Sequence, residues 1–180
     1  MSEKLVNEFI QKAEAAAAKV TRVKTLDEAY REVLNIIHEA QVHEVGCVAT
    51  DMTQGLFPLL KEQGIKAIAE GAPRDLARLE IGIVPVDVGI AETGTVAHDA
   101  TDLYSRYFSM LCPVNIVMLR TSRIKENMTE ALKLLENSGI YPAYMAFITG
   151  PSRTADIERV LTIGVHGPGR LHIILVDEGE

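Results

Sequence analysis

Short apolar runs alternate with longer amphipathic segments along almost the whole chain, and this alternation strongly limits the possible folds. The runs are rich in valine and isoleucine, which is typical of strands buried in a parallel sheet. Strands are predicted over residues 46–50, 65–69, 81–91, 95–97, 114–119, 144–148 and 171–176, with a short β-like connector over 19–23. This order predicts an α/β fold, with a three-layer, mostly parallel sheet and helices on both faces.

The segments between these runs carry apolar residues at helical spacing. Helices are predicted over residues 2–19, 26–42, 51–63, 73–79, 102–111, 123–137 and 152–161. Two helix ends have specific signals: Thr25 to Glu28 has the capping-box pattern, and Gly139 supplies a left-handed residue after the helix 123–137. A chain of 180 residues fits one domain over 1–180. Within it, residues 1–42 are expected to form a helical N-terminal appendage.

Charge and composition exclude several classes of function. The chain has 18 basic and 25 acidic side chains, and a net charge of −7 disfavours binding to nucleic acid. No apolar run reaches the roughly 18 residues that a membrane span needs, and no secretory signal opens the sequence. Cys47 and Cys112 are far apart and form no C-x-x-C pair, so no metal or iron–sulfur site is expected. We therefore expect a cytoplasmic protein that binds neither nucleic acid nor membrane.

Three loops contain groups suited to chemistry, and the richest is ITGPSRTADIE at residues 148–158. It follows a predicted strand and opens a predicted helix, whose free amides favour an anion. Gly150 lets the backbone approach a ligand, and Arg153 matches a carboxylate or phosphate. The simpler alternative is that a hydroxyl of Ser152 or Thr154 caps the helix and the arginine pairs with a downstream carboxylate.

The other two loops are AETGT at residues 91–95 and IGVHGPG at 163–169. Glu92 is a candidate base, nucleophile or hydrogen-bond acceptor, although a hairpin turn with a solvated glutamate explains the same pattern. His166 is a candidate acid or base between glycines, or else a structural histidine. Its loop precedes a strand, so in a simple parallel sheet it would lie at the opposite end from the first two loops. Weaker candidates for the same site are His98, Asp99, Arg106 and Arg120.

The sequence closely resembles the LUD-domain family, of the lactate-utilisation protein C type. The resemblance lies in the three motifs AETGT, ITGPSRTADIE and GVHGP, and in the run LHIILV soon after the last of them. The resemblance implies a fold similar to the superfamily of sugar-phosphate isomerases, glucosamine-phosphate deaminases and CoA-transferases. Carried over by motif, it assigns catalytic roles to Glu92 and His166. It assigns substrate or anion contacts to Thr93, Gly94, Thr95, Thr149, Gly150, Ser152, Arg153, Thr154, Asp156 and Gly167.

The function implied by this resemblance is a part in the oxidation of lactate to pyruvate. We expect a non-redox component that binds a small carboxylate through Arg153 and the amides of residues 152–154. No cofactor is expected on this chain, because the family acts beside an iron–sulfur LUD-domain protein and a cysteine-rich subunit that hold the clusters. Two alternatives stay open: an independent acyl- or CoA-transferase-like enzyme with Glu92 as nucleophile, and an assembly protein without an active site. A homodimer is also compatible with the sequence.

Overall fold

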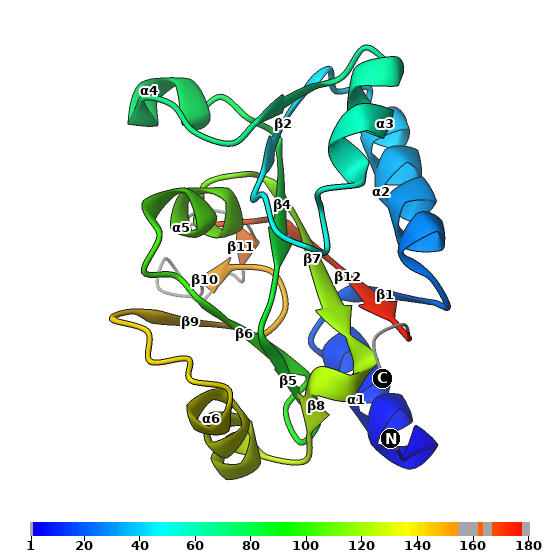
Figure 1. Cartoon of the computed structure of the whole chain (residues 1–180), viewed down its shortest axis with the longest axis vertical. Coiled ribbons are helices and arrows are strands. Elements are labelled where there is room, and N and C mark those ends of the chain that lie inside the picture. Colours follow the sequence, from blue (N-terminus) through cyan, green and yellow to red (C-terminus); the bar gives the residue numbers. More distant parts are fainter. Residues whose placement is uncertain (1, 155–161, 164–166, 178–180) are drawn as a thin grey trace.

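The computed structural model describes residues 2–154, 162–163 and 167–177 (Figure 1). Its centre is a six-stranded sheet in the order β1-β12-β7-β4-β2-β3, in which every neighbouring pair is parallel. The strands are β1 (Lys19–Val23), β2 (Glu44–Cys47), β3 (Lys66–Ile68), β4 (Ile81–Pro85), β7 (Val114–Arg120) and β12 (Arg170–Val176). The predicted α/β fold with a mostly parallel sheet is confirmed.

Alternate residues of β7 define the two faces of this sheet. Ile116 and Met118 belong to the core that α2 (Leu26–Ala40) and α3 (Leu56–Glu62) cover. Val117 and Leu119 belong to the core under α1 (Glu3–Ala15) on the opposite face. Farther along that second face, α4 (Pro73–Leu76) and α5 (Leu103–Met110) pack over β4 through the buried side chain of Phe108. Helices therefore cover both faces, as the alternation of strands and helices predicts.

A second, four-stranded sheet lies beside the main one, in the order β8-β5-β6-β9. Its strands are β5 (Val88–Ile90), β6 (Thr95–Asp99), β8 (Ile124–Lys125) and β9 (Met145–Ile148), and α6 (Met128–Asn137) packs on it. Strands β5 and β6 form an antiparallel hairpin around Glu92, Thr93 and Gly94, as expected. The run 81–91 is therefore two strands in different sheets. The break falls after Pro85: the Val86 amide still donates to the Met118 carbonyl of β7 at 2.9 Å, whereas the Asp87 amide donates to the Ala97 carbonyl of β6 at 2.9 Å.

The N-terminal region is part of this body. Val6, Phe9 and Ala13 of α1 are buried in the core, and β1 pairs with β12 in the main sheet. The capping box is present, because the Thr25 hydroxyl accepts from the amide of Glu28 at 3.2 Å. The expectation of a helical appendage over residues 1–42 does not describe this packing, since these elements share both cores.

Three predicted helices have different limits in the structure. The segment 51–63 becomes helical only at Leu56, and the segment 123–137 begins with β8 and a cap at Asn127. The helix expected from residue 152 is wrong at its start, where β10 (Arg153–Thr154) pairs antiparallel with β11 (Thr162–Ile163). The Ser152 amide donates to the Pro168 carbonyl at 2.8 Å, which draws the chain alongside the loop before β12 instead of into a helix. Residues 155–161 of that predicted helix lie outside the described part.

Candidate functional site

Two of the three predicted loops meet through a row of threonine hydroxyls. The Thr95 hydroxyl, at the start of β6, lies 2.7 Å from the hydroxyl of Thr93 in the β5–β6 turn. It also lies 2.7 Å from the hydroxyl of Thr149, directly after β9. Thr95 is buried while Thr93 and Thr149 are exposed, so the row of hydroxyls runs from the surface inward and out again, and the antiparallel pairing of β6 with β9 sets its register.

The third predicted loop joins the second at the same place. Besides the bond from the Ser152 amide to the Pro168 carbonyl, a Cβ on Gly167 would lie only 3.2 Å from the Cβ of Ser152. Both loops lie at the amino ends of β7 and β12, where the Gly169 amide donates to the Pro113 carbonyl. A simple parallel sheet would place the loop before β12 at the opposite end from the loop after β9. The two loops nevertheless lie together, because β9 belongs to the second sheet and runs antiparallel to β6.

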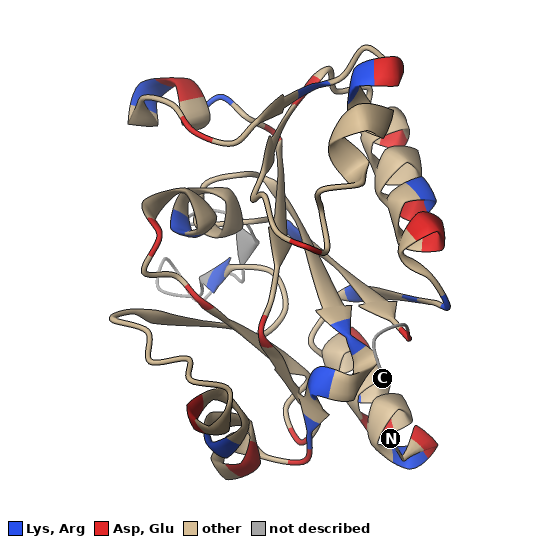
Figure 2. Cartoon of the chain, viewed as in Figure 1, with Lys and Arg blue, Asp and Glu red and all other residues tan. Residues whose placement is uncertain are grey.

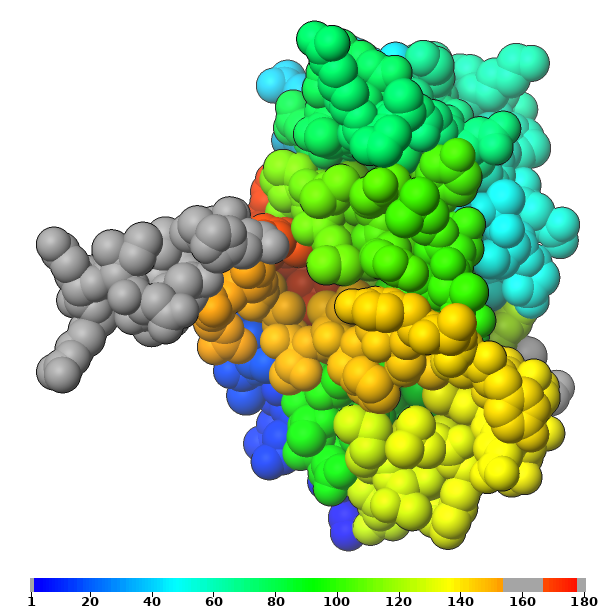
Figure 3. Space-filling view, turned by 90° about the vertical axis from the view of Figure 1, so that its left-hand side faces the viewer, coloured from blue at the N-terminus to red at the C-terminus, as the bar shows by residue number. Residues whose placement is uncertain are grey.

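These loops enclose a cavity of about 250 Å³, called here the motif cavity. Four residues predicted from the sequence line it: Thr149, Gly150, Ser152 and Gly167. Its wall is completed by Ser109, Met110, Asn115, Phe147, Ile148, Pro151, Pro168 and Leu171. Figure 3 shows a hollow here, between the green of α5 and the orange segment that includes β9, with the red of β12 behind. The described wall therefore combines hydroxyls and glycine backbone with apolar side chains.

The end of α1 contacts three predicted site residues, of which Gly150 also lines the motif cavity. The Arg153 guanidinium donates to the Ala16 carbonyl at 2.6 Å. Gly150 has φ +68°, and a Cβ there would lie 2.0 Å from the same carbonyl oxygen and 3.0 Å from Arg153 Nη2. Gly94 has φ +66°, and its Cβ would lie 2.2 Å from the amide nitrogen of Ala13. These residues fasten α1 to the body and place the arginine beside the wall of the motif cavity.

The predicted catalytic pair is not brought together within the described residues. Glu92 is exposed, and its carboxylate accepts from the Met128 amide at 3.1 Å, at the start of α6. It does not line the motif cavity. His166 and Asp156 lie outside the described residues, and of Thr154 only the backbone in β10 is described.

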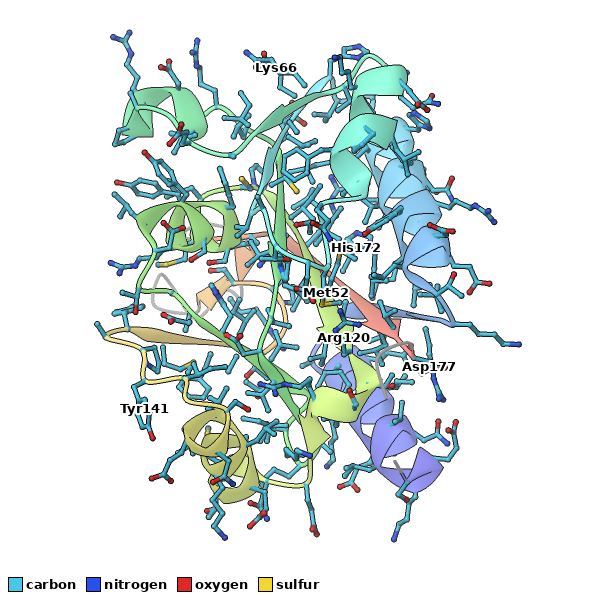
Figure 4. The ribbon with its side chains drawn as sticks, viewed as in Figure 1. Met52, Lys66, Arg120, Tyr141, His172 and Asp177 are labelled. Atoms are coloured by element: carbon cyan, nitrogen blue, oxygen red, sulfur yellow. The ribbon has the colours of Figure 1, made fainter. Side chains whose placement is uncertain are left out.

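A larger cavity of about 670 Å³, called here the large cleft, lies at the carboxyl ends of β2, β4 and β7. In α/β sheets ligands bind preferentially at this end, so topology alone points to it. Figure 4 shows Arg120, at the end of β7, close to Met52 in the loop after β2, and both line the cleft. Its ionisable side chains include Asp51, Asp87, Asp99, Asp102, Arg120, Arg123 and His98. Only His98, Asp99 and Arg120 among these were candidates from the sequence, because the others lie outside its motifs.

Both cysteines are buried away from these cavities. Burial raises the pKa of the Cys47 thiol to about 12, and burial does the same for Cys112. Since the thiolate is the form that binds metals, these thiols are poor ligands. Within residues 2–154, 162–163 and 167–177, no group of three or more His, Cys, Asp or Glu side chains is placed to hold a metal ion. Nor is any helix of that part long and apolar enough to cross a lipid bilayer.

Comparison with known proteins identifies relatives along nearly the whole chain. Residues 6–176 match the model of the LUD domain. Lactate utilization protein C 1 of Bacillus mycoides is 39% identical over 103 residues, which are 55% of this chain and 44% of that protein. Lactate utilization protein C of Bacillus subtilis is 30% identical over 144 residues, covering 67% of this chain and 60% of that protein. In most of these alignments the chain spans about half the length of the curated relatives it matches.

A solved structure supports the fold independently of these sequences. The crystal structure of a DUF162 family protein from Deinococcus radiodurans superimposes with a TM-score of 0.71. The superposition covers 98% of this chain and 99% of the other, at 19% sequence identity. At that identity the likeness establishes the shared architecture, including the arrangement of the main sheet and its helices.

Proposed function

This chain belongs to the LUD domain family, and from that premise we propose that it acts in lactate utilisation by binding a small carboxylate in the motif cavity. The observation that carries the proposal is the convergence of Thr149, Gly150, Ser152 and Gly167 on one cavity. These residues come from two separate motifs, and no helical or strand periodicity requires them to meet. The curated relatives are named for lactate utilisation, which supports a short organic acid as the ligand.

The hydroxyls of the cavity suit a carboxylate chemically. A threonine hydroxyl has one proton to donate and can also accept. In the row Thr93–Thr95–Thr149, each hydroxyl can therefore donate to the next, and Thr149 can donate its own proton to an anion. Such a chain polarises its last member and strengthens the final bond. Ser152 supplies a second hydroxyl from the opposite side of Pro151, and Arg153 adds positive charge beside Gly150.

The apolar part of the wall suits the carbon skeleton of the same ligand. Met110, Phe147 and Leu171 line the cavity together with the hydroxyl-bearing residues. A short hydroxy or oxo acid has one charged end and a small apolar end, which match these two parts of the wall. We propose that the carboxylate lies toward Thr149 and Ser152 and the alkyl group toward Met110 and Phe147.

The redox step is proposed to belong to partner proteins. The buried thiols of Cys47 and Cys112 have a raised pKa, which makes them unsuited to holding an iron–sulfur cluster. We propose that an iron–sulfur LUD-domain protein and a cysteine-rich subunit accept the electrons, while this chain binds the acid. Purified alone, the chain is expected to bind lactate without oxidising it.

Isothermal titration calorimetry with L-lactate, D-lactate and pyruvate tests the proposed site. Thr149→Val and Ser152→Ala each remove one hydroxyl. Each should lower the affinity for the tightest-binding acid by about fivefold, which corresponds to the loss of one hydrogen bond. Ser138→Ala is the matched control, because that hydroxyl donates within the end of α6. Equal affinities in all three variants would refute the site, and so would the absence of binding at millimolar concentrations of every acid.

A further inference from the structure

We propose that the large cleft is a second ligand site, separate from the motif cavity, and that it takes a small organic cation carrying ammonium groups. This proposal goes beyond the function proposed above, since it concerns the opposite end of β7 and a ligand of opposite charge. Three observations carry it: the balance of charge in the wall, the fixing of the carboxylates, and a buried histidine nitrogen that needs a donor.

Acidic side chains outnumber basic ones around the cleft. They come from the loops after β2 and β4, from the last residue of β6 and from the loop that follows it, and the red segments in Figure 2 run from the middle of the view to its left edge. Arg120 forms an ion pair with Asp51 at 2.9 Å, which compensates the charge of both. Arg123 is then the remaining arginine of the wall, and its guanidinium donates to the Asp87 carbonyl and the Ser138 hydroxyl. The same wall contains three further carboxylates, those of Asp87, Asp99 and Asp102. Such a wall repels an anion such as lactate and attracts a cation.

The three carboxylates are held in place before any ligand arrives. Asp87 accepts from the Asp99 amide at 2.6 Å, and Asp99 accepts from the Thr101 amide at 2.8 Å. Asp102 caps α5 by accepting from the Ser105 amide at 2.7 Å. Each bond uses one carboxylate oxygen, and a carboxylate can accept on both. The wall thus presents fixed acceptors, which lowers the ordering cost of binding a donor.

His98 is the independent observation that points to a donor-bearing ligand. Its neighbour Ala97 packs against α6, so His98 on the same strand faces the other way, toward the large cleft that it lines. Only 2% of its surface is exposed. Its Nδ1 lies 3.3 Å from the Asp99 carbonyl oxygen, which only accepts, so Nδ1 carries the proton and Nε2 is an acceptor.

Among the residues described, no group donates to this Nε2 atom. A buried acceptor without a donor is costly, and an ammonium or hydroxyl proton would satisfy it. Burial also lowers the pKa of His98, which favours the neutral ring that this role needs. A carboxylate has no proton to offer there, whereas an ammonium group has three.

Calorimetry with three four-carbon ligands tests the charge preference. 1,4-Diaminobutane is a double cation, 1,4-butanediol is neutral, and succinate is a double anion of similar length. The diamine should bind at least tenfold more tightly than the other two, and its affinity should fall as sodium chloride is added. Tighter binding of succinate, or no binding of the diamine at millimolar concentrations, would overturn the proposal.

Two charge-removing variants locate the site. Asp87→Asn and Asp99→Asn keep a side-chain oxygen that can accept from the backbone amide, but they lose the negative charge. Each should lower the affinity for the diamine by about fivefold. Asp75→Asn is the control, since that aspartate lies on α4 and pairs with Arg78. Losses no larger than in Asp75→Asn would overturn the proposal. If a variant fails to fold by circular dichroism, the ligand series and salt dependence of the wild-type protein decide. Ser152→Ala should leave diamine affinity unchanged, so the two proposed sites can fail separately.

Discussion

The guanidinium of Arg153 donates a hydrogen bond of 2.6 Å to the carbonyl oxygen of Ala16, 137 residues earlier and directly after α1. A cation at the C-terminus of a helix is favourable both as a donor to its last carbonyls and through the helix dipole. The motif arginine therefore links the first helix to the loop that lines the motif cavity. An anion in that cavity would lie near a guanidinium that is already held in place.

Arg153→Ala should lower the free energy of unfolding by about 1 kcal/mol, because it removes a charged donor from the end of α1. Urea denaturation followed by circular dichroism measures the change. Arg74→Ala, on the exposed helix α4, should have a much smaller effect. If both substitutions cost the same, the Arg153–Ala16 contact contributes nothing to stability.

Gly94→Ala and Gly150→Ala should each destabilise the protein by roughly 2–5 kcal/mol. Each adds the strain of a left-handed alanine, about 1–2 kcal/mol, to a collision with the backbone of α1. Gly139→Ala is a matched control, because its φ of +70° is nearly the same but nothing lies within 4 Å of the new Cβ. Thermal unfolding of the three variants separates strain from collision. Equal losses would contradict the close packing of the two loops on α1.

His98 should make the protein less stable as the pH falls. Burial lowers its pKa below the ordinary 6.5, although Asp87 and Asp99 oppose the shift. The unfolded chain then takes up the proton first, so the contribution to stability is present above pH 6.5 and is lost as the pH falls toward the folded value. His98→Gln should reduce the slope of the unfolding free energy between about pH 7.5 and about pH 5, while His172, whose pKa burial also lowers, keeps part of it. An unchanged slope in His98→Gln would contradict this role of the buried His98 ring.

Glu92→Gln should lower stability by about 0.5 kcal/mol, because it removes a negative charge from the N-terminus of α6. Glu136→Gln, near the other end of the same helix, should be neutral or slightly stabilising for the same reason. Chemical denaturation measures both.

Intact mass spectrometry after incubation with acetyl-CoA supplies the functional readout for Glu92. An acyl adduct present in the wild type and absent in Glu92→Gln would favour the transferase alternative over carboxylate binding.

Much of the architecture was predictable because buried parallel strands carry their signal locally. The runs that became β7 and β12 are apolar except for Asn115 and His172, and both are interior strands of the main sheet. The run 81–91 shows the limit of such a signal. Periodicity does not reveal that β4 and β5 belong to different sheets, because the change of partner from β7 to β6 falls between Val86 and Asp87, inside one apolar run.

The candidate site was predictable in its residues but not in its arrangement. Thr149, Gly150, Ser152 and Gly167 were identified from motifs, and they do line one cavity. The contacts of Gly94, Gly150 and Arg153 with α1 depend on segments far apart in the sequence, which local patterns do not encode. The roles of all these residues in binding stay predictions, and so do those of Glu92, Thr93, Thr95, Thr154, Asp156 and His166 in binding or catalysis.

The measurement that tests the central claim most directly is a titration of ¹⁵N-labelled protein with L-lactate, followed by two-dimensional NMR. The account predicts that the largest shifts occur at the backbone amides of Thr149, Gly150, Ser152 and Gly167, and that Ser152→Ala weakens the response. Shifts confined to residues 98–102 and 120–123, in the wall of the large cleft, would contradict it, because the acid would then bind at the opposite end of β7.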